Sequence, residues 1–328
     1  MSASVTVIIV NFNAGEHLRR CVAALKAQSY TDFSVVLVDN ASSDRSLDLA
    51  RAEIGDDTRF SISQPQSNLG FAAGNNRGAA NTQSRWIATL NPDAFPAADW
   101  LETLVGATKR HPDIAMFGST QVMANDPAKL DGAGDRYFVA GIPWRDRSRA
   151  RLDNARKQGH DTFETFSPCA AAALYRSNAF RDAGGFDENF FCYVEDVDLA
   201  FRMRRRGHRC LQVIDALVHH VGGGAGGGRR SDFARYHGTR NLVWCFAKNM
   251  PIGPLILLAP IHLIILGFFL TIAALQGNGG AVARGIRDGI GGLRRIKREK
   301  HDAAARSTVL DAVDWTPLGY LRQRFRGE

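Results

Sequence analysis

A cluster of carboxylates stands out at Glu195, Asp196 and Asp198, within the stretch FFCYVEDVDLAFRMRRRG at 190–207. Acids at its start and arginines near its end match the charges that stabilise the two ends of a helix. Aromatic residues precede the acids, and shielding from water raises the pKa of a carboxylate toward the range of a general base. The stretch therefore has two interpretations, helix capping and proton abstraction.

Further polar side chains follow apolar runs that are typical of buried parallel strands. Asn11 follows VTVIIV, Asp39 ends SVVLVD, and Asn91 and Asp93 follow WIATL. Each alone fits a turn or a helix cap. The carboxyl ends of parallel strands meet at one edge of a sheet, where ligands collect. Together these residues predict a cleft with donors and acceptors suited to a nucleotide.

Strand and helix signals alternate through the first ninety residues. Strands are expected at 5–10, 34–39, 60–63 and from 86 onward, and Asn13 is expected to cap the first helix. The buried face of that helix is predicted from apolar residues at helical spacing, namely Leu18, Cys21, Val22 and Leu25. This alternation predicts an α/β fold with a mostly parallel sheet covered on both faces.

The segment NLGFAAGNNRGAA at 68–80 carries three glycines together with Asn68 and Asn76. Glycine lets a backbone approach a ligand closely, and the asparagines offer polar side chains. Small residues at Gly74 and Gly78 also suit a helix packed tightly on a sheet. Both interpretations stay open. The weakly periodic segment 120–166 is expected to form excursions beside the cleft, where an acceptor could bind.

Composition limits the class of protein. The chain has 328 residues, of which 45% are hydrophobic and 23% charged, enough for one principal domain with an appendage. Its five cysteines are scattered without CxxC spacing, so a disulfide framework and a zinc cluster are not supported, and a reducing cytoplasm is expected. The apolar run VTVIIV is too short for a signal sequence and indicates a strand.

The C-terminal region combines an apolar block with positive charge. The block spans 255–275, is interrupted by Pro260 and His262, and precedes seven Lys or Arg between Arg284 and Lys300. An apolar segment beside basic residues is typical of the cytoplasmic face of a membrane. The alternatives are a buried helix pair and an oligomer interface. The formal net charge is +8, but no aromatic-basic module for nucleic acid is visible.

Four blocks in order resemble the family 2 glycosyltransferases with the GT-A fold. They are the segment from VTVIIVNFN to DNASSD, NLGFAAGNNRG, LNPDAF, and the segment from CAAAALYRSNAF to YVEDVDLAFRMRRRGHR. The overlap runs from about Val5 to Lys248. The HHVGGG segment, whose glycines are expected to form a flexible loop over a ligand, and RNLVWCFAKN look most like bacterial rhamnosyltransferase-type members.

The resemblance implies a GT-A domain over 1–249, divided into a nucleotide-binding half (1–118) and an acceptor-side half (119–249). Residues 250–328 would form an apolar and basic membrane-associating region. The apolar block and the basic residues after it place the protein at the cytoplasmic face of the inner membrane, either peripheral or with one apolar segment in the bilayer. The expected partners are a dTDP- or UDP-sugar donor, a saccharide or lipid-linked saccharide acceptor, the membrane surface and further copies of the chain.

The resemblance also assigns roles to the polar residues at the predicted sheet edge. Asp39 would bind the nucleotide base, and Asn11, or the backbone beside it, and Asn76 would help to hold the base or ribose. Asn68 and Asn91 are expected in the same donor-binding set. Asp93 would ligate Mg²⁺ or Mn²⁺, a hard oxygen ligand for a hard cation. His219, in preference to His220, would complete the metal shell. Asn91 departs from the family's DxD motif, where an aspartate would stand.

Asp196 would be the general base that deprotonates the acceptor hydroxyl, and Glu195 would orient the acceptor or its loop. A single displacement by that hydroxyl inverts the anomeric centre. Two other classes are weaker. A sugar-phosphate nucleotidyltransferase needs a glycine-rich basic loop after the first strand, where NFNAGEHLRR has one glycine. An inactive membrane-attached carbohydrate-binding or scaffold protein would tolerate Asn91, but it does not require Asp39, Asp93 and Asp196.

Overall fold

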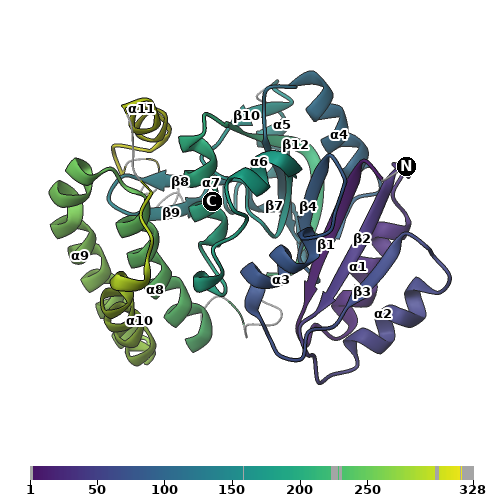
Figure 1. Cartoon of the computed structure of the whole chain (residues 1–328), viewed down its shortest axis with the longest axis horizontal. Helices are drawn as coiled ribbons and strands as arrows, with labels where there is room; N and C mark the ends of the chain where they lie inside the picture. The colour runs from purple at the N-terminus through teal and green to yellow at the C-terminus, as the bar shows by residue number, and fades with distance from the viewer. Residues whose placement is uncertain are drawn as a thin grey trace.

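A ten-stranded mixed sheet forms the centre of the molecule (Figure 1). The computed structural model describes residues 3–157, 159–222, 228, 231–299, 303–317 and 319. The strands of this sheet are β1 (Val5–Asn11), β2 (Phe33–Asp39), β3 (Phe60–Ser63), β4 (Trp86–Leu90), β5 (Ala94–Pro96), β6 (Met116–Met123), β7 (Asp126–Gly132), β10 (Thr162–Glu164), β11 (Ala172–Arg176) and β12 (Cys210–His220).

The main strands follow the order β10-β12-β6-β11-β4-β1-β2-β3, with β5 paired to β12 and β7 to β6. Strands β4, β1, β2 and β3 are mutually parallel, as the apolar runs predict, and β6 is parallel to β12. Strand β11 runs antiparallel between β4 and β6. Strands β5, β7 and β10 also run antiparallel to their partners, so the sheet is mixed, with its parallel strands grouped around β1.

Helices cover both faces of the sheet. Helices α1 (Glu16–Lys26), α2 (Ser46–Ile54) and α4 (Trp100–Arg110) share one apolar core with β1 and β2. The opposite face of β1 packs into a second core, which contains residues of α3 (Gly70–Ala79), α6 (Ser177–Asp182) and α7 (Glu195–Arg205). The alternating faces of the strands therefore feed two separate cores. The predicted α/β architecture is confirmed.

The glycines of α3 allow this helix to lie directly on β1. A Cβ added at Gly78 would come within 2.5 Å of Ile8 Cγ2, and one at Gly74 within 2.7 Å of Val10 Cγ1. Contacts this short do not occur between real side chains. The interpretation of this glycine-rich segment as a helix packed tightly on the sheet is therefore correct.

The predicted cap of the first helix is wrong. Helix α1 starts after Gly15 without a side-chain cap, and Asn13 has a φ of 52°. The side chain of Asn13 instead accepts hydrogen bonds from the backbone of Ser43 (2.8 Å) and Asp44 (3.3 Å). Tertiary contact with the loop after β2 thus replaces the local cap. The predicted apolar face of the helix is buried as expected.

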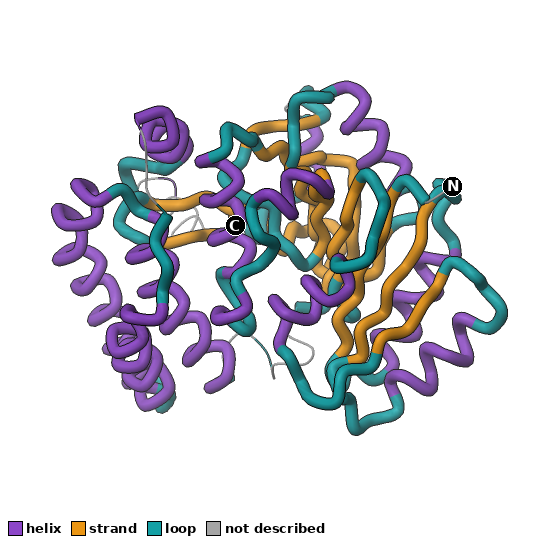
Figure 2. Tube along the Cα trace, viewed as in Figure 1, coloured by secondary structure: helices purple, strands orange, loops and turns teal. Residues whose placement is uncertain are grey.

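The C-terminal helices gather on one side of the molecule, away from β1–β3 (Figure 2). They are α8 (Asp232–Asn249), α9 (Ile252–Leu275), α10 (Gly279–Gly291) and α11 (Ala303–Ala312). A hairpin of β8 (Asp135–Phe138) and β9 (Ile142–Arg145) lies beside them, and the short α5 (Leu152–Arg156) follows it in the chain. Two short 3₁₀ turns span Glu188–Phe190 and Gly292–Arg295.

Helix α9 is long and apolar enough to cross a membrane, by length and composition alone. His262, which interrupts the apolar sequence of the helix, is buried. Its Nδ1 lies 2.8 Å from the carbonyl oxygen of Ala140. Most other side chains of the helix are exposed, including Ile256, Leu257, Ile264 and Phe268. The helix therefore attaches to the protein along one narrow side.

Candidate active site

A cavity of about 690 Å³ opens at the carboxyl ends of β1 and β4. Its wall includes Asn68, Asn91, Asp93, Glu195 and Asp196 of the residues singled out in the sequence. Much of the remaining wall is apolar and aromatic. It comes from the first strand and α3, the β8–β9 hairpin, the turn before α7, and α8. A cleft lies at this edge of the sheet, and Glu195 and Asp196 of the acidic stretch line it, whereas Asp198 does not.

Asp196 stands in the first turn of α7, at the cavity wall. Its Oδ2 accepts a hydrogen bond from the backbone N–H of Ala170 (3.0 Å), and its Oδ1 from that of Val197 (2.9 Å). Burial raises the pKa of Asp196 above its usual value, although these hydrogen bonds and the charge of Arg145 act in the opposite direction. A carboxylate held in this way has a stronger affinity for a proton than an exposed aspartate.

Glu195 is more deeply desolvated than its neighbour. Burial, followed by the charge of Asp196, raises its pKa well above the ordinary glutamate value. Its Oε2 is buried and accepts no hydrogen bond within the described part of the chain. Asp198 differs: burial alone would raise its pKa, but the charges of Arg202 and Lys248 outweigh that effect and lower it. Asp198 is thus held in a structural ion pair.

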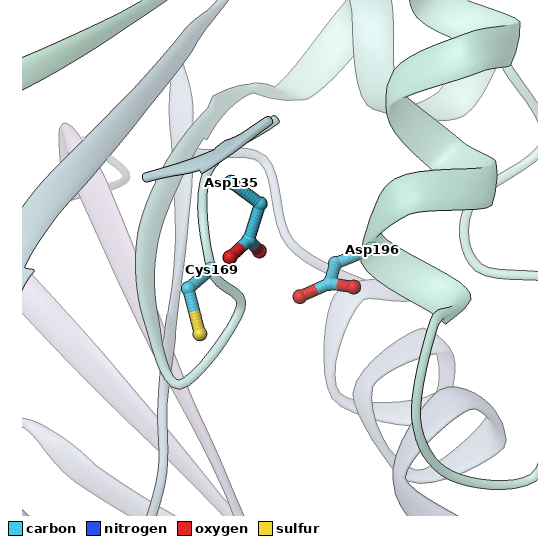
Figure 3. Close-up of side chains that lie close together, drawn as sticks. All are labelled: Asp135, Cys169 and Asp196. Atoms are coloured by element: carbon cyan, nitrogen blue, oxygen red, sulfur yellow. The ribbon is translucent and has the colours of Figure 1, made fainter. Parts of the chain in front are cut away.

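Asp135 and Cys169 converge on Asp196 (Figure 3). The carboxylate oxygens and the sulfur lie within 4.8 Å of one another. The guanidinium of Arg145 is in contact with this group, because its Nη2 donates to Cys169 Sγ and its Nε lies 3.7 Å from Asp135 Oδ1. The positive charge of Arg145 already offsets part of the negative charge of Asp135 and Asp196. We therefore do not assign a metal ion to it.

Asp93 and His220 form a second polar group in the cavity. His220 Nε2 lies 3.5 Å from Asp93 Oδ1, and His220 Nδ1 lies 3.0 Å from Asp131 Oδ2. Both side chains at the first contact are buried. The resemblance favours His219, but neighbouring residues of a strand point to opposite faces. The structure places His220, rather than His219, beside Asp93 and at the cavity wall.

Asp39 and Asn11 are paired behind the cavity. Asn11 Nδ2 donates to Asp39 Oδ1 (2.7 Å), and also to Ser46 Oγ (2.8 Å) and Ser42 Oγ (3.0 Å). Both residues are almost completely buried and neither lines the cavity as the chain is folded here. The structure thus brings them together, with the asparagine orienting the carboxylate at the end of β2.

The other asparagines differ in what they contact. Asn68 lines the cavity, but its Oδ1 accepts from the backbone N–H of Gly70 (2.8 Å). Asn76 lies outside it and binds backbone atoms of Phe186 through both ends of its amide (2.8 and 2.9 Å). Asn76 therefore ties α3 to the segment before α7. Asn91 lines the cavity at the end of β4, two residues before Asp93.

The turn that leads into α7 has an unusual backbone. Phe191, Tyr193 and Val194 have φ angles of 64°, 73° and 70°, although none is glycine. Asn241 of α8 donates from Nδ2 to the carbonyl oxygens of Phe190, Cys192 and Tyr193. Sequence reasoning missed this contact. RNLVWCFAKN is a visible block, but no local pattern links it to a turn about fifty residues earlier.

Sequence comparison decides the family. The family model described as "Glycosyl transferase family 2" matches residues 6–184, which is more than half of the chain. The chain belongs to glycosyltransferase family 2. The matched region of this glycosyltransferase includes the first three motif blocks, with Asp39 and Asp93, and ends before α7.

Individual relatives agree with the family. The glycosyltransferase is 26% identical over 270 residues to an N-acetylglucosaminyl-diphospho-decaprenol L-rhamnosyltransferase of Mycobacterium tuberculosis, covering 72% of this chain and 82% of the relative. It is 31% identical over 222 residues to the pre-mycofactocin glycosyltransferase of the same organism, covering 66% of this chain and 42% of the relative.

Among solved structures, the fold is similar to a mannosyltransferase from Pyrobaculum calidifontis in complex with GDP-Man and Mn²⁺. The TM-score is 0.56 at 18% identity, covering all of this chain and 89% of that one. It is also similar to S. aureus TarS in complex with UDP-GlcNAc, with a TM-score of 0.56 at 15% identity, covering 98% of this chain and 88% of that one. The GT-A fold implied by the resemblance is confirmed.

Proposed function

We propose that this glycosyltransferase moves a sugar from a nucleoside-diphosphate sugar to a hydroxyl of a saccharide or lipid-linked saccharide in the synthesis of a cell-surface polysaccharide. Rhamnose, carried by dTDP, is the first donor to test, because the Mycobacterium tuberculosis relative is an L-rhamnosyltransferase. The observation that carries the proposal is one cavity lined by both Asp93 and Asp196. These two carboxylates suit the diphosphate end and the acceptor end of one reaction.

Asp196 is the proposed general base. The acceptor hydroxyl oxygen forms a bond to the anomeric carbon as the bond from that carbon to the diphosphate oxygen breaks. The electron pair leaves with the nucleoside diphosphate, and the hydroxyl proton passes to Asp196. Burial of this carboxylate suits the role, because a base with a raised pKa takes a proton more readily. Glu195, beside it, is proposed to orient the acceptor.

This single displacement gives a product with inverted anomeric configuration. Asp135 is the carboxylate that could change this outcome, since it lies within 4.8 Å of Asp196. Its proximity to the guanidinium of Arg145 favours a role in orienting the acceptor instead. Proton NMR of the first-formed product gives the anomeric configuration. Retention would point to Asp135 as a nucleophile and contradict the proposal.

Asp93 and His220 fit a divalent cation. The Nε2 of His220 is buried without a hydrogen-bond partner among the described residues, and it faces a carboxylate oxygen at 3.5 Å. Carboxylate oxygens suit Mg²⁺ and Mn²⁺, and an imidazole can complete the shell. A bound cation would supply charge stabilisation for the departing diphosphate. Asp131 would hold the imidazole in place through Nδ1.

At the other end of the donor, Asp39 is proposed to bind the base of the nucleotide. Asn11 holds its carboxylate in place, and Asn68 and Asn91, which line the cavity, are proposed to help hold the donor. Asn76 lies outside the cavity and keeps its contacts with Phe186. A modest rearrangement of the loops after β1 and β2 would be required for contact, because Asp39 is buried. His219 is a weaker candidate than His220 for the metal, because neighbouring side chains of a strand point to opposite faces and it is His220 that lines the cavity.

The first experiment is a thermal-shift screen of UDP-, dTDP- and GDP-sugars, with and without Mn²⁺ or Mg²⁺. We expect one class of nucleotide sugar to raise the melting temperature of the wild type in a metal-dependent way. Asp93→Ala should lose that metal-dependent shift, because the cation loses a buried ligand. Asp48→Ala, which removes an exposed carboxylate on α2, is the matched control and should keep it.

A second candidate function is an inactive, membrane-attached carbohydrate-binding or scaffold protein. It is favoured only by Asn91, which replaces the first aspartate of the DxD motif. Absence of any shift with all nucleotide sugars, together with absence of donor hydrolysis, would support the scaffold and contradict the transferase. In that event the role of Asp196 would be structural, through its hydrogen bonds to the backbone of Ala170 and Val197.

A further inference from the structure

The carboxylates Glu195 and Asp196 follow a backbone turn that is unfavourable for its own residues. Val194 occupies the position just before α7 with φ 70° and ψ −3°, a left-handed conformation. Phe191 and Tyr193 also have positive φ. Residues with a Cβ rarely adopt this conformation, and β-branched valine least of all. Something outside the turn must therefore hold it.

Asn241 is the side chain that does so. It is completely buried on α8, and its Nδ2 lies 2.9 Å from the carbonyl oxygen of Phe190, 2.9 Å from that of Cys192 and 2.7 Å from that of Tyr193. The two hydrogens of one amide are shared among three backbone acceptors. Arg240, the preceding residue, adds a bond from Nη2 to the carbonyl of Phe190 (2.8 Å).

The same turn is held from the opposite side by α3. The backbone N–H groups of Phe71 and Ala72 donate to the carbonyl oxygen of Phe191, at 2.7 and 3.1 Å. Gly70 has φ 80°, and a Cβ there would lie 2.5 Å from the Phe191 ring. The turn is therefore clamped between α3, which packs on β1, and α8, which belongs to the C-terminal helices.

We propose that Asn241 is a positioning residue, which fixes the turn at 190–194 so that Asp196 reaches the cavity in a reactive orientation. The inference rests on the proposed function, because it takes Asp196 as the base. Asn241 itself does not line the cavity, so it acts through the turn rather than on a substrate. Release of the three carbonyls would let the turn relax toward ordinary φ values and rotate the first turn of α7.

The test uses the full chain with two substitutions. Asn241→Leu removes the donor at nearly constant volume, and Asn241→Asp replaces the donor with a carboxylate that the three carbonyls repel. We expect kcat to fall at least tenfold in both, while the Kd of the nucleoside diphosphate, measured by equilibrium titration, stays within twofold. A general loss of folding would alter both quantities, so circular dichroism at the assay temperature accompanies each measurement.

Gln28→Glu is the matched control. Gln28 is also a buried amide that donates to backbone carbonyls, those of Ala97 (2.7 Å) and Ala24 (3.2 Å), and it lies away from the cavity. The same amide-to-carboxylate change there should lower the melting temperature but leave kcat within twofold of the wild type. Folded Asn241→Leu and Asn241→Asp proteins with a kcat within twofold of the wild type would overturn the inference.

A double-mutant cycle examines the strain directly. Val194→Gly removes the conformational preference that Asn241 opposes, since glycine accepts positive φ without penalty. The loss of kcat caused by Asn241→Leu should therefore be at least threefold smaller in the Val194→Gly background. Independent, multiplicative effects of the two substitutions would contradict the proposed role.

Asp196→Asn, measured in parallel, separates this inference from the function on which it rests. If Asp196→Asn abolishes turnover and the Asn241 variants do not reduce it, only the positioning role fails. If Asp196→Asn turns over as fast as the wild type, the proposed base fails, and with it the reason for holding the turn. Loss of turnover in both sets, with donor binding intact, supports both.

Discussion

Two buried carboxylates three positions apart on α7 have pKa values that are shifted in opposite directions. Glu195 is desolvated and its Oε2 finds no hydrogen-bond donor among the residues described, so its pKa rises. Asp198 is as deeply buried, but Arg202 (2.8 Å) and Lys248 (2.9 Å) contact it, and its pKa falls. At this scale, the partners of a carboxyl group decide its charge, and burial alone does not.

The raised pKa of Glu195 predicts a pH-dependent stability. The folded state binds the proton more tightly than the unfolded state, so the stability gained by protonation is present at low pH and is lost as pH rises through the folded pKa. Glu195→Gln removes this pH-dependent loss of stability, because glutamine does not ionise. Its free energy of unfolding relative to the wild type should increase with pH above the unfolded glutamate pKa, by up to about 1.4 kcal/mol per pH unit.

Urea unfolding at several pH values between 5 and 9 on both proteins measures this difference, on the order of a few kcal/mol over the range. Charged groups near Glu195 that also titrate, Asp196 above all, are common to both proteins. Glu102→Gln, at an exposed position on α4, is the matched control for the loss of one negative charge. A difference for Glu195→Gln that does not vary with pH would show that this side chain is ionised throughout.

At the scale of elements, α3 is positioned by what its residues lack. The helix lies against β1 because Gly74 and Gly78 present no side chain to Val10 and Ile8. This close approach also brings the start of the helix to the turn before α7. The packing of α3 on the sheet and the geometry of the proposed base are therefore connected through one short helix.

Gly78→Ala should consequently destabilise the protein, although alanine favours helices. The added methyl would meet Ile8 Cγ2 at 2.5 Å, and overpacking of this kind costs about 1–3 kcal/mol. Gly106→Ala on α4 meets only the flexible end of Arg110, and it should be neutral or stabilising by up to about 1 kcal/mol. Thermal or urea unfolding compares the two. Equal effects would show that α3 can shift on the sheet.

The sequence predicts β1, β2 and β4 well because each contains an apolar run that a polar residue ends or follows. Prediction is poorer where a residue's partner is distant in the chain. Asn13 fits a cap by its type, yet it bonds to the loop after β2. The choice between His219 and His220 depends on strand parity and register, and Asn241 reveals its role only once α8 lies beside the turn.

At the scale of the whole molecule, α9 presents a long apolar surface together with basic residues that follow it. Its exposed side chains include Leu257 and Ile264, and His262 faces inward. Arg294 and Arg295 lie in the 3₁₀ turn after α10, the helix that packs beside α9. Charge of this sign complements an anionic lipid surface. We therefore propose a membrane as the partner of this surface.

The full chain should co-sediment with vesicles that contain anionic lipid, and more weakly with neutral ones. Leu257→Asp combined with Ile264→Asp should reduce the partition coefficient at least tenfold, because each apolar side chain contributes about 1.5–3 kcal/mol when buried. Ile62→Asp, at an exposed position of β3, is the control and should bind as the wild type does. Wild-type dimers without vesicle binding, dissociated by the α9 substitutions, would identify the surface as an oligomer interface instead.

The contacts of α8 have a practical consequence for producing the protein. This helix supplies Asn241 to the turn and Lys248 to Asp198, and it is itself braced from behind, where Trp244 Nε1 donates to the carbonyl of Gly289 on α10 (2.8 Å). Deletion of the chain after 249 would remove that brace. A water-soluble variant for crystallisation or inhibitor screening is therefore better obtained by replacing exposed side chains of α9 than by shortening the gene.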